Sequence, residues 1–448
     1  METNHYDKPT IENTACLLLP IKGGADLEAD ILRKQIKSSK DSVPSCKRDW
    51  YVSNNGDDNA SGDSPDTPWL TIQAHTDKLE YGDAVLFERG GVFRGGISCV
   101  SGVFYGAYGS GDKPCIYVSR MNYAKADWEK VSENLWRTEI EENSDIGIMV
   151  FNHGEALGFK KKTLDDVKNH LDFYCEGNYV WLCHNQLPAE AWKSIEMGDL
   201  VHIFYMGSGT HDVTIENITM KYGGGMAVQG SDNVKNITVR NCEIGWIGGS
   251  YLPNYKDGKV RYGNGIEFWK GCENILVENC WIYQIYDSGL SHQGHGDFVQ
   301  KDIIFRNNLV EYTSFASIEY WTNDQNRNRM ENIVYANNIL RFAGYAWGEA
   351  QRPDHPGYHI LSTGKMDHKC TNFQITGNIM DVSARALIRC TSAVGTLPEI
   401  SGNTYIQNKG GLLGAYGDVE MPNLSFDDDA KDTLANVFGD NQATVIFI

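Results

Sequence analysis

The stretch Leu276-Val-Glu-Asn-Cys-Trp-Ile282 decides the fold, because variants of it recur along the second half of the chain. Each variant has alternating apolar residues, a bend that contains Asn or Gly, and a second short apolar run. The other copies are residues 214–220, 238–244, 304–310, 334–340, 374–380 and 399–405. Their fourth residues lie 24 to 40 positions apart, a spacing typical of the coils of a parallel β-helix with insertions at its turns.

The fifth position of the repeat predicts an internal ladder of side chains. This position is occupied in successive coils by Cys242, Cys280, Asn308, Asn338, Asn378 and Asn403. Stacked Asn side chains at such a position satisfy backbone groups that the bend buries. We therefore interpret the two cysteines as core residues and not as redox groups.

Composition and charge agree with a repetitive β protein and narrow the partners. The chain has 448 residues with 46 Gly but only 12 Pro, which indicates many tight turns. Its net charge of −19 argues against nucleic acid and an anionic membrane as partners, since both require a basic surface. The 11 cysteines include no CxxC pair, so neither a disulfide framework nor a zinc site is expected.

Targeting signals also bear on the class of protein. The only apolar run near the N-terminus, residues 16–20, is too short for a signal peptide or a membrane span. We expect a cytoplasmic protein as the sequence stands, or a secreted one if a signal peptide has been removed. The expected parts are an N-terminal extension (1–48), first coils with a capping helix near 70–80 (49–118), an inserted small β domain (119–205), the main coils (206–417) and a closing segment (418–448).

Three stretches of the first coils carry a resemblance to a known superfamily. They are Trp50-Tyr-Val-Ser-Asn-Asn-Gly-Asp-Asp58, Pro68-Trp-Leu-Thr-Ile-Gln73 and Gly82-Asp-Ala-Val-Leu-Phe-Glu-Arg-Gly90. They resemble the opening of right-handed parallel β-helix proteins of the pectate-lyase-like superfamily, and among these the chain is similar to β-helix glycoside hydrolases with a small inserted β domain. The resemblance covers residues 50–415 and implies an all-β, right-handed parallel β-helix. It leaves the activity open, because this superfamily includes hydrolases, lyases, epimerases and adhesins.

The strand that follows each bend places chemically useful residues on one outer face. Segments 225–229, 265–269, 289–293 and 317–321 can be stacked by their apolar positions, so that alternate side chains point outward. One predicted outward column contains Ala227, Glu267, Ser291 and Glu319, and the next contains Gln229, Trp269, Gln293 and Trp321. Carboxylates beside tryptophans are typical of sugar sites, because the indole ring packs on the apolar face of a pyranose.

The two glutamates are predicted to be catalytic. Adjacent coils lie ~4.8 Å apart, so the backbones of Glu267 and Glu319 lie ~9.6 Å apart across two coils. Carboxyl groups ~6.5–9.5 Å apart act as general acid and general base in inverting glycosidases. Asp287, just before Ser291 in the middle coil, is a third candidate, either as the acid or as the nucleophile of a retaining enzyme. The alternative is that outward glutamates are merely solvated.

Further residues are candidates for binding substrate. His292 and His295 flank the middle coil, although strict alternation turns His292 inward as a core residue. One long loop ends at Arg261, Tyr262 and Asn264 and begins at Trp246, and a second loop contains Trp347, Arg352 and His355. No cofactor or metal is expected, with calcium held by Asp287 and the glutamates as the alternative.

The predicted function is a glycoside hydrolase that cleaves a poly- or oligosaccharide in a groove on the β-helix face. One alternative is a polysaccharide lyase or epimerase acting on uronate-containing glycans, and the other is a non-catalytic carbohydrate-binding β-helix. The outward columns hold no Lys or Arg to serve as the base of an elimination; Lys270 follows Trp269 by one residue. The sequence leaves the sugar, its linkage and the oligomeric state open.

Overall fold

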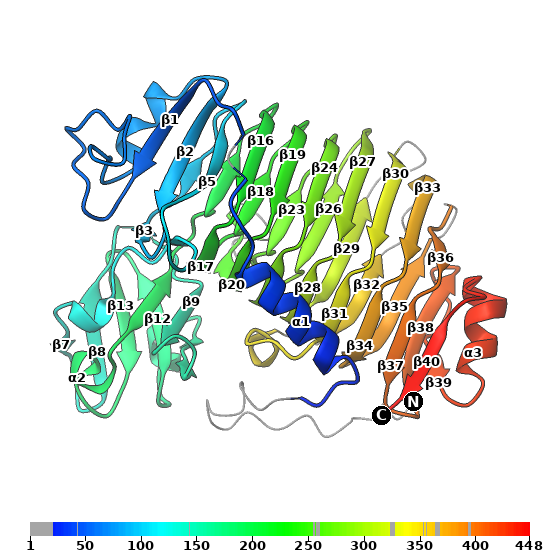
Figure 1. Ribbon diagram of the computed structural model, residues 1–448. Helices are drawn as coiled ribbons and strands as arrows, with labels where there is room; N and C mark the ends of the chain where they lie inside the picture. The colour runs from blue at the N-terminus through cyan, green and yellow to red at the C-terminus, as the bar shows by residue number, and fades with distance from the viewer. Residues whose placement is uncertain are drawn as a thin grey trace.

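The computed structural model describes residues 21–42, 44–142, 144–253, 256, 260–322, 328–352, 354, 356–362, 368–392 and 396–448. The chain winds as a right-handed parallel β-helix in which each coil adds one strand to each of three long sheets (Figure 1). All pairs within these sheets are parallel except β38 with β39. The sequence prediction of the fold is therefore confirmed.

The three sheets each contain ten strands. Sheet A consists of β1 (Arg48–Val52), β2 (Asp83–Glu88), β5 (Phe104–Tyr108), β16 (His211–Glu216), β19 (Lys235–Arg240), β24 (Glu273–Glu278), β27 (Val299–Arg306), β30 (Asn328–Ala336), β33 (His368–Thr376) and β36 (Glu399–Ser401). Sheet B consists of β3 (Val92–Arg94), β6 (Cys115–Tyr117), β17 (Thr219–Gly223), β20 (Glu243–Ile247), β25 (Trp281–Ile285), β28 (Leu309–Thr313), β31 (Ile339–Ala343), β34 (Ile379–Ser383), β37 (Thr404–Gln407) and β40 (Thr444–Phe447). Sheet C consists of β4 (Ile97–Ser98), β15 (Phe204–Met206), β18 (Val228–Gly230), β23 (Ile266–Phe268), β26 (Leu290–Gly294), β29 (Ala316–Thr322), β32 (Tyr358–Ser362), β35 (Ala386–Thr391), β38 (Gly411–Gly417) and β39 (Leu424–Phe426).

The bend between sheets A and B explains the repeated sequence. The fourth residue of each repeat has a left-handed backbone, with φ between 52° and 66°. Asn and Gly tolerate this conformation better than other residues, because the short Asn side chain bonds locally and Gly lacks a Cβ. The residues concerned are Asn217, Asn241, Asn279, Asn307, Asn337, Gly377 and Gly402.

The next residue forms the predicted ladder inside the β-helix. Asn338 Oδ1 accepts hydrogen bonds from Asn308 N and Nδ2, both at 3.0 Å, while Asn338 Nδ2 donates to Phe305 O at 2.9 Å. Asn378 repeats this arrangement one coil later, and all of these side chains are fully buried. The ladder ends at Asp440, whose carboxylate accepts from Asn403 N at 3.1 Å. Each Asn side chain thus satisfies backbone groups of the preceding coil, and its own backbone N–H is satisfied by the Asn of the next coil.

The inserted domain leaves the β-helix between β6 and β15 without interrupting its stacking, since β5 pairs directly with β16 and β6 with β17. It contains one five-stranded and one three-stranded sheet with a separate core that includes Trp128, Phe151 and Phe173. The five-stranded sheet has the order β11 (Phe159–Lys160), β12 (Asp172–Glu176), β13 (Tyr179–Cys183), β8 (Leu135–Glu139) and β7 (Glu129–Lys130). The three-stranded sheet has the order β10 (Ala156–Leu157), β9 (Ile148–Phe151) and β14 (Ile195–Gly198).

Both ends of the chain are fastened to the β-helix. The helix α1 (Asp26–Lys37) lies across the coils of sheet B, where Ala29 and Ile36 pack on Leu309 and Ile339 (Figure 1). At the other end, α3 (Ala430–Thr433) and the helical turn Leu434–Phe438 close the core before β40 joins sheet B. In the part of the chain that the structure describes, no helix is both long and apolar enough to cross a membrane.

The ladder gives the first prediction. Asn338→Ala removes the partners of the buried Asn308 N–H and Phe305 carbonyl in the preceding coil, so we expect it to lower the free energy of unfolding by about 3 kcal/mol. Thr371→Ala, at an exposed position of β33 in sheet A, is the control and is expected to change it by less than ~0.5 kcal/mol. Urea unfolding followed by tryptophan fluorescence measures both variants; equal effects would contradict a supporting role for the ladder.

Candidate active site

The two predicted glutamates lie in one register column of sheet C. Glu267 of β23 pairs with Ser291 of β26, which pairs with Glu319 of β29. The preceding coil differs from the prediction, because Gln229 and not Ala227 pairs with Glu267. The glycine run before Met226 lengthens the turn, so that β18 begins at Val228 and Ala227 is buried in the main core.

Both glutamates are buried, although they point away from the core of the β-helix. Glu267 is 5% exposed and Glu319 is 9% exposed, so they are not simply solvated. Burial raises the pKa of Glu267 to about 7, because the hydrogen bonds it accepts offset only part of the loss of water. Burial, followed by the negative charge of Asp287, raises the pKa of Glu319 to about 8. Two carboxyl groups with such pKa values exchange protons near neutral pH.

Hydrogen bonds connect the two carboxyl groups through the turn before β26. Asn264 Nδ2 donates to Glu267 Oε2 at 2.6 Å, and Gln293 Nε2 donates to the same oxygen. Asn264 Oδ1 accepts the backbone N–H of Ser288 at 2.8 Å, and Ser288 Oγ donates to Glu319 Oε2 at 2.9 Å. Glu267 is thus held by two amide donors and Glu319 by a hydroxyl. The sequence analysis missed Ser288, although it lies next to Asp287.

Asp287 lies beside the glutamates and is paired with an arginine from the second predicted loop. Arg352 Nη1 donates to Asp287 Oδ1 at 2.8 Å, and the guanidinium lies over the rings of Tyr286 and Phe315. Burial raises the pKa of Asp287, and Arg352 offsets part of that effect. His355 of the same loop lies outside the described residues.

An aromatic group adjoins the glutamates on the same face, because Glu319 and Trp321 are two residues apart on one strand. The imidazole of His295 lies 4.7 Å from the ring of Trp321 and 5.4 Å from that of Trp269, between ring centroids. Gln293 pairs with Trp321 in the register. We call the surface formed by Glu267, Ser291, Gln293, Glu319 and these three rings the glutamate face.

Several residues predicted to bind substrate lie elsewhere. His292 is fully buried, its ring nitrogens bonded to Gln300 and Tyr335, so it is a core residue. Trp246 and Trp347 pack between sheet B and the inserted domain, because a left-handed backbone at Trp246 breaks the alternation of that strand. The structure therefore does not bring these three side chains to the glutamates.

The first predicted loop serves mainly to join the two parts of the molecule. It forms the hairpin β21 (Ser250–Tyr251) and β22 (Arg261–Tyr262). Arg261 donates to Gly147 O and Gly249 O and lies over the ring of Tyr286, so its guanidinium ties the inserted domain to the β-helix instead of facing substrate. Tyr262 remains a binding candidate because it lies close to Glu267. Burial, and then the charge of Glu267, raise the pKa of its phenol.

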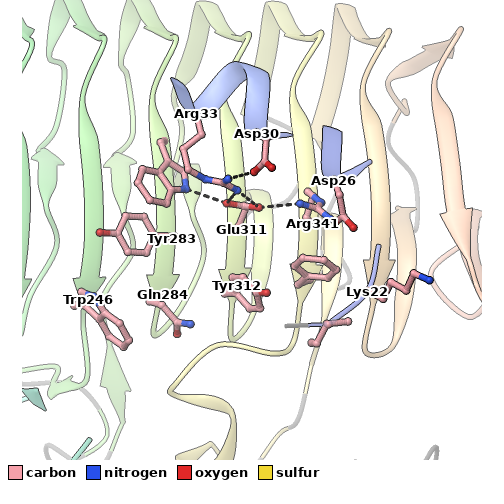
Figure 2. Close-up of a pocket in the computed structure, with 13 residues that line it drawn as sticks. Lys22, Asp26, Asp30, Arg33, Trp246, Tyr283, Gln284, Glu311, Tyr312 and Arg341 are labelled. Atoms are coloured by element: carbon pink, nitrogen blue, oxygen red, sulfur yellow. Dashed lines mark hydrogen bonds and ion pairs between the residues drawn. The ribbon is translucent and has the colours of Figure 1, made fainter. Parts of the chain in front are cut away.

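A separate cavity of about 680 Å³ lies on sheet B beside α1 (Figure 2). Its central carboxylate, Glu311, accepts hydrogen bonds from Arg33, Arg341 and the indole of Trp281. The charge of this carboxylate is therefore balanced by two guanidinium groups. Among the residues that the structure describes, no group of three or more His, Cys, Asp or Glu is arranged to hold a metal ion.

Comparison with known proteins finds solved structures that are similar to this chain at low sequence identity. No family model matches the chain, and no curated protein matches its sequence. A solved structure of XylC with xylose is 13% identical over 82% of this chain and 69% of its own, with a TM-score of 0.46. The lacto-N-biosidase of Eubacterium ramulus is 15% identical (90% and 68% covered, TM-score 0.34), and pectate lyase Pel9A is 12% identical (84% and 73% covered, TM-score 0.41). These β-helix neighbours include glycoside hydrolases and lyases, and likeness this distant carries no information on the reaction of this chain.

Burial of Glu319 predicts a pH-dependent stability. Its folded pKa of about 8 lies above the ordinary value of 4.5, so the folded state holds its proton longer than the unfolded state. This group therefore costs stability progressively as the pH rises from about 4.5 to about 8. We expect Glu319→Gln to stabilise the protein relative to wild type by about 3 kcal/mol more at pH 9 than at pH 5.

Ser291→Ala, in the same column without a charge, is the matched control and should show the same difference from wild type at both pH values. Urea unfolding at pH 5 and pH 9 measures all three proteins. A pH-independent effect of Glu319→Gln would show that Glu319 ionises normally in the folded protein.

Proposed function

We propose that the protein is a glycoside hydrolase that acts at the glutamate face. The observation that supports this proposal is the in-register placement of Glu267 and Glu319 two coils apart, both buried and both with raised pKa values. Two coils separate the backbones by ~9.6 Å, and side chains that lean together bring the carboxyl groups within the ~6.5–9.5 Å of an inverting pair. Ser291 between them is small enough to leave room for a water molecule.

The surroundings of the two carboxyl groups favour a division of roles. Burial and the charge of Asp287 favour the protonated form of Glu319, and the single hydroxyl hydrogen bond from Ser288 offsets this only in part, so in this proposal Glu319 is the general acid. Glu267 receives two amide hydrogen bonds on one oxygen, which favour its ionised form, so in this proposal it is the general base. Tyr262 and Gln293 are the proposed contacts to the hydroxyl groups of the sugar.

In the proposed step the anomeric carbon exchanges one oxygen for another. Glu319 gives its proton to the glycosidic oxygen as the bond from that oxygen to the anomeric carbon breaks. Glu267 takes a proton from a water molecule whose oxygen bonds to the anomeric carbon from the opposite side of the ring. The products are an alcohol and a sugar of inverted configuration, and solvent returns the proton from Glu267 to Glu319.

The indole rings of Trp269 and Trp321 supply the apolar surface for adjoining sugar rings. Pyranose rings present C–H groups on one face, and these pack on an aromatic ring while the hydroxyl groups at the rim are bonded by planar polar groups. Asp287 is the alternative catalytic carboxylate, as the nucleophile of a retaining reaction next to Glu319. The configuration of the first product, followed by NMR, distinguishes the two reactions.

Activity measurements test the proposal directly. Wild-type protein incubated with plant and algal glycans and aryl glycosides is expected to release reducing ends without the ultraviolet absorbance of unsaturated uronates. Glu319→Gln and Glu267→Gln should each lower kcat by about 10³-fold or more, because each removes a proton-transfer group of the same shape. Glu331→Gln, at a half-buried strand position of sheet A outside the glutamate face, is the control and should retain wild-type activity.

Two outcomes would contradict the proposal. Equal release of reducing ends and absorbance, especially with loss of both on treatment with EDTA, would identify a lyase. If Glu319→Gln and Glu267→Gln both turned over substrate at the wild-type rate, neither glutamate would take part in the reaction.

The pKa values also predict the pH dependence of hydrolysis. The base must be ionised and the acid protonated, so kcat/KM should rise near pH 7 and fall near pH 8. The negative charge of Asp287 contributes to raising both pKa values, so Asp287→Asn should move both limbs of the profile to lower pH. Initial rates between pH 4 and pH 10 provide the test, with Glu331→Gln as the unshifted control. If Asp287→Asn did not shift the pH profile of kcat/KM, the charge of Asp287 would not raise the pKa values of the two glutamates.

A further inference from the structure

The charges around the glutamate face restrict the sugar that it accepts. We propose that the sugar ring held between Glu267 and Glu319 carries no carboxylate, so that the substrate is a neutral glycoside and not a uronide; this inference rests on the proposed function. Three carboxyl groups, those of Glu267, Asp287 and Glu319, lie close enough for their charges to influence one another. A uronate carboxylate brought to this position needs a cation to offset its loss of water and its repulsion by the ionised groups.

Arg352, which lies beside Asp287, is already paired with two carboxylates. The side chain of Arg352 is 10% exposed and lies between two carboxylates. Its Nη1 donates to Asp287 Oδ1 and to Tyr286 O, while Nε and Nη2 donate to the two oxygens of Asp354. Its charge is therefore balanced before any substrate arrives.

Two further cations near the face are also engaged. Arg261 uses Nε and Nη2 on backbone carbonyls and Nη1 on Gln351 at 2.8 Å, and its guanidinium is stacked on aromatic rings. Lys270, which follows Trp269, is paired with Asp232 at 3.1 Å. Among the residues that the structure describes, the other groups on this face are amide donors and aromatic rings, such as Gln293 and Trp321, which suit hydroxyl groups and C–H faces.

Arginines farther along the β-helix lie out of reach of this ring. Arg389 shares the column of Glu319 but is two coils away, or ~9.6 Å along the axis. Its guanidinium donates to Met421 O, Val419 O and Asn423 Oδ1 in the closing segment. Arg385 precedes β35 in that same coil, which is three coils beyond the one that holds Asp287. Neither arginine reaches a carboxylate on a ring positioned between the two glutamates.

Matched substrates test the proposal. The p-nitrophenyl glucosides and galactosides, in both anomeric forms, are compared with the glucuronides and galacturonides, which differ only by a carboxylate in place of the hydroxymethyl group. We expect kcat/KM for the preferred neutral member to exceed that of its uronide by at least about 100-fold, because every arginine and lysine described beside the face is already paired. A uronide hydrolysed as fast as its neutral counterpart would overturn the proposal while leaving hydrolysis intact.

Binding separates failure of this inference from failure of the proposed function. Quenching of tryptophan fluorescence is titrated with neutral xylo-oligosaccharides and with oligogalacturonates, and Trp269→Ala serves as the control for binding at this face. If the neutral oligosaccharides bound but no glycoside were hydrolysed, the proposed hydrolase activity would be rejected and the preference for a neutral sugar would be supported. Tighter binding of the acidic oligosaccharides, or binding of neither class, would overturn the inference.

A charge variant provides an independent test. Asp232→Asn frees the ammonium group of Lys270 beside Trp269 without altering the glutamate face. It should strengthen binding of oligogalacturonates by about threefold, the size expected from one exposed charge pair, and leave binding of xylo-oligosaccharides unchanged. Asp232→Glu keeps the pair and is the matched control. Equal gains for both classes of oligosaccharide would contradict the assigned role of charge.

Discussion

The structure depends on the pairing of backbone groups that each bend would otherwise leave buried without partners. A coil that turns sharply from one sheet to the next buries polar groups that the sheet ladders do not reach, and a buried unpaired group costs as much as a hydrogen bond gains. The Asn side chains at positions 308, 338, 378 and 403 each supply the missing partners to the coil before. Because the same residue does this in successive coils, the coils stack without sliding, and the register of sheet C is fixed as well.

The fixed register determines where Glu267 and Glu319 lie. A slip by one residue in β29 would turn Glu319 into the core and bring Tyr320 out, since neighbouring side chains in a strand point to opposite faces. The two glutamates are therefore positioned by backbone pairing along the axis of the β-helix and not by the loops. The loops contribute the electrostatic surroundings instead: Asn264 and Ser288 hold the carboxyl groups, and Arg352 balances Asp287.

The sequence predicted the fold, the ladder and the alignment of Glu267 with Glu319, because all three follow from a repeated local pattern. It failed where the pattern is interrupted. The glycines before Met226 concealed the length of a turn and shifted Gln229 into the glutamate column, and the left-handed backbone at Trp246 turned that ring towards the inserted domain. The burial of the glutamates and the contact of Arg352 with Asp287 depend on segments 65 residues apart in the chain, which no local pattern encodes.

Asp440, the last residue of the ladder, determines how this end of the β-helix is closed. A stack of identical coils exposes at its terminus the donors that would receive another coil, and such open ends favour growth into filaments. Asp440 occupies that position with a carboxylate that accepts from the backbone and side chain of Asn403 and from the hydroxyl of Tyr405. A carboxylate accepts hydrogen bonds but, when ionised, donates none, so it cannot pass the ladder on to a further Asn. An Asp in place of an Asn at this ladder position thus leaves the next coil no side-chain donor, and the ladder stops at Asp440.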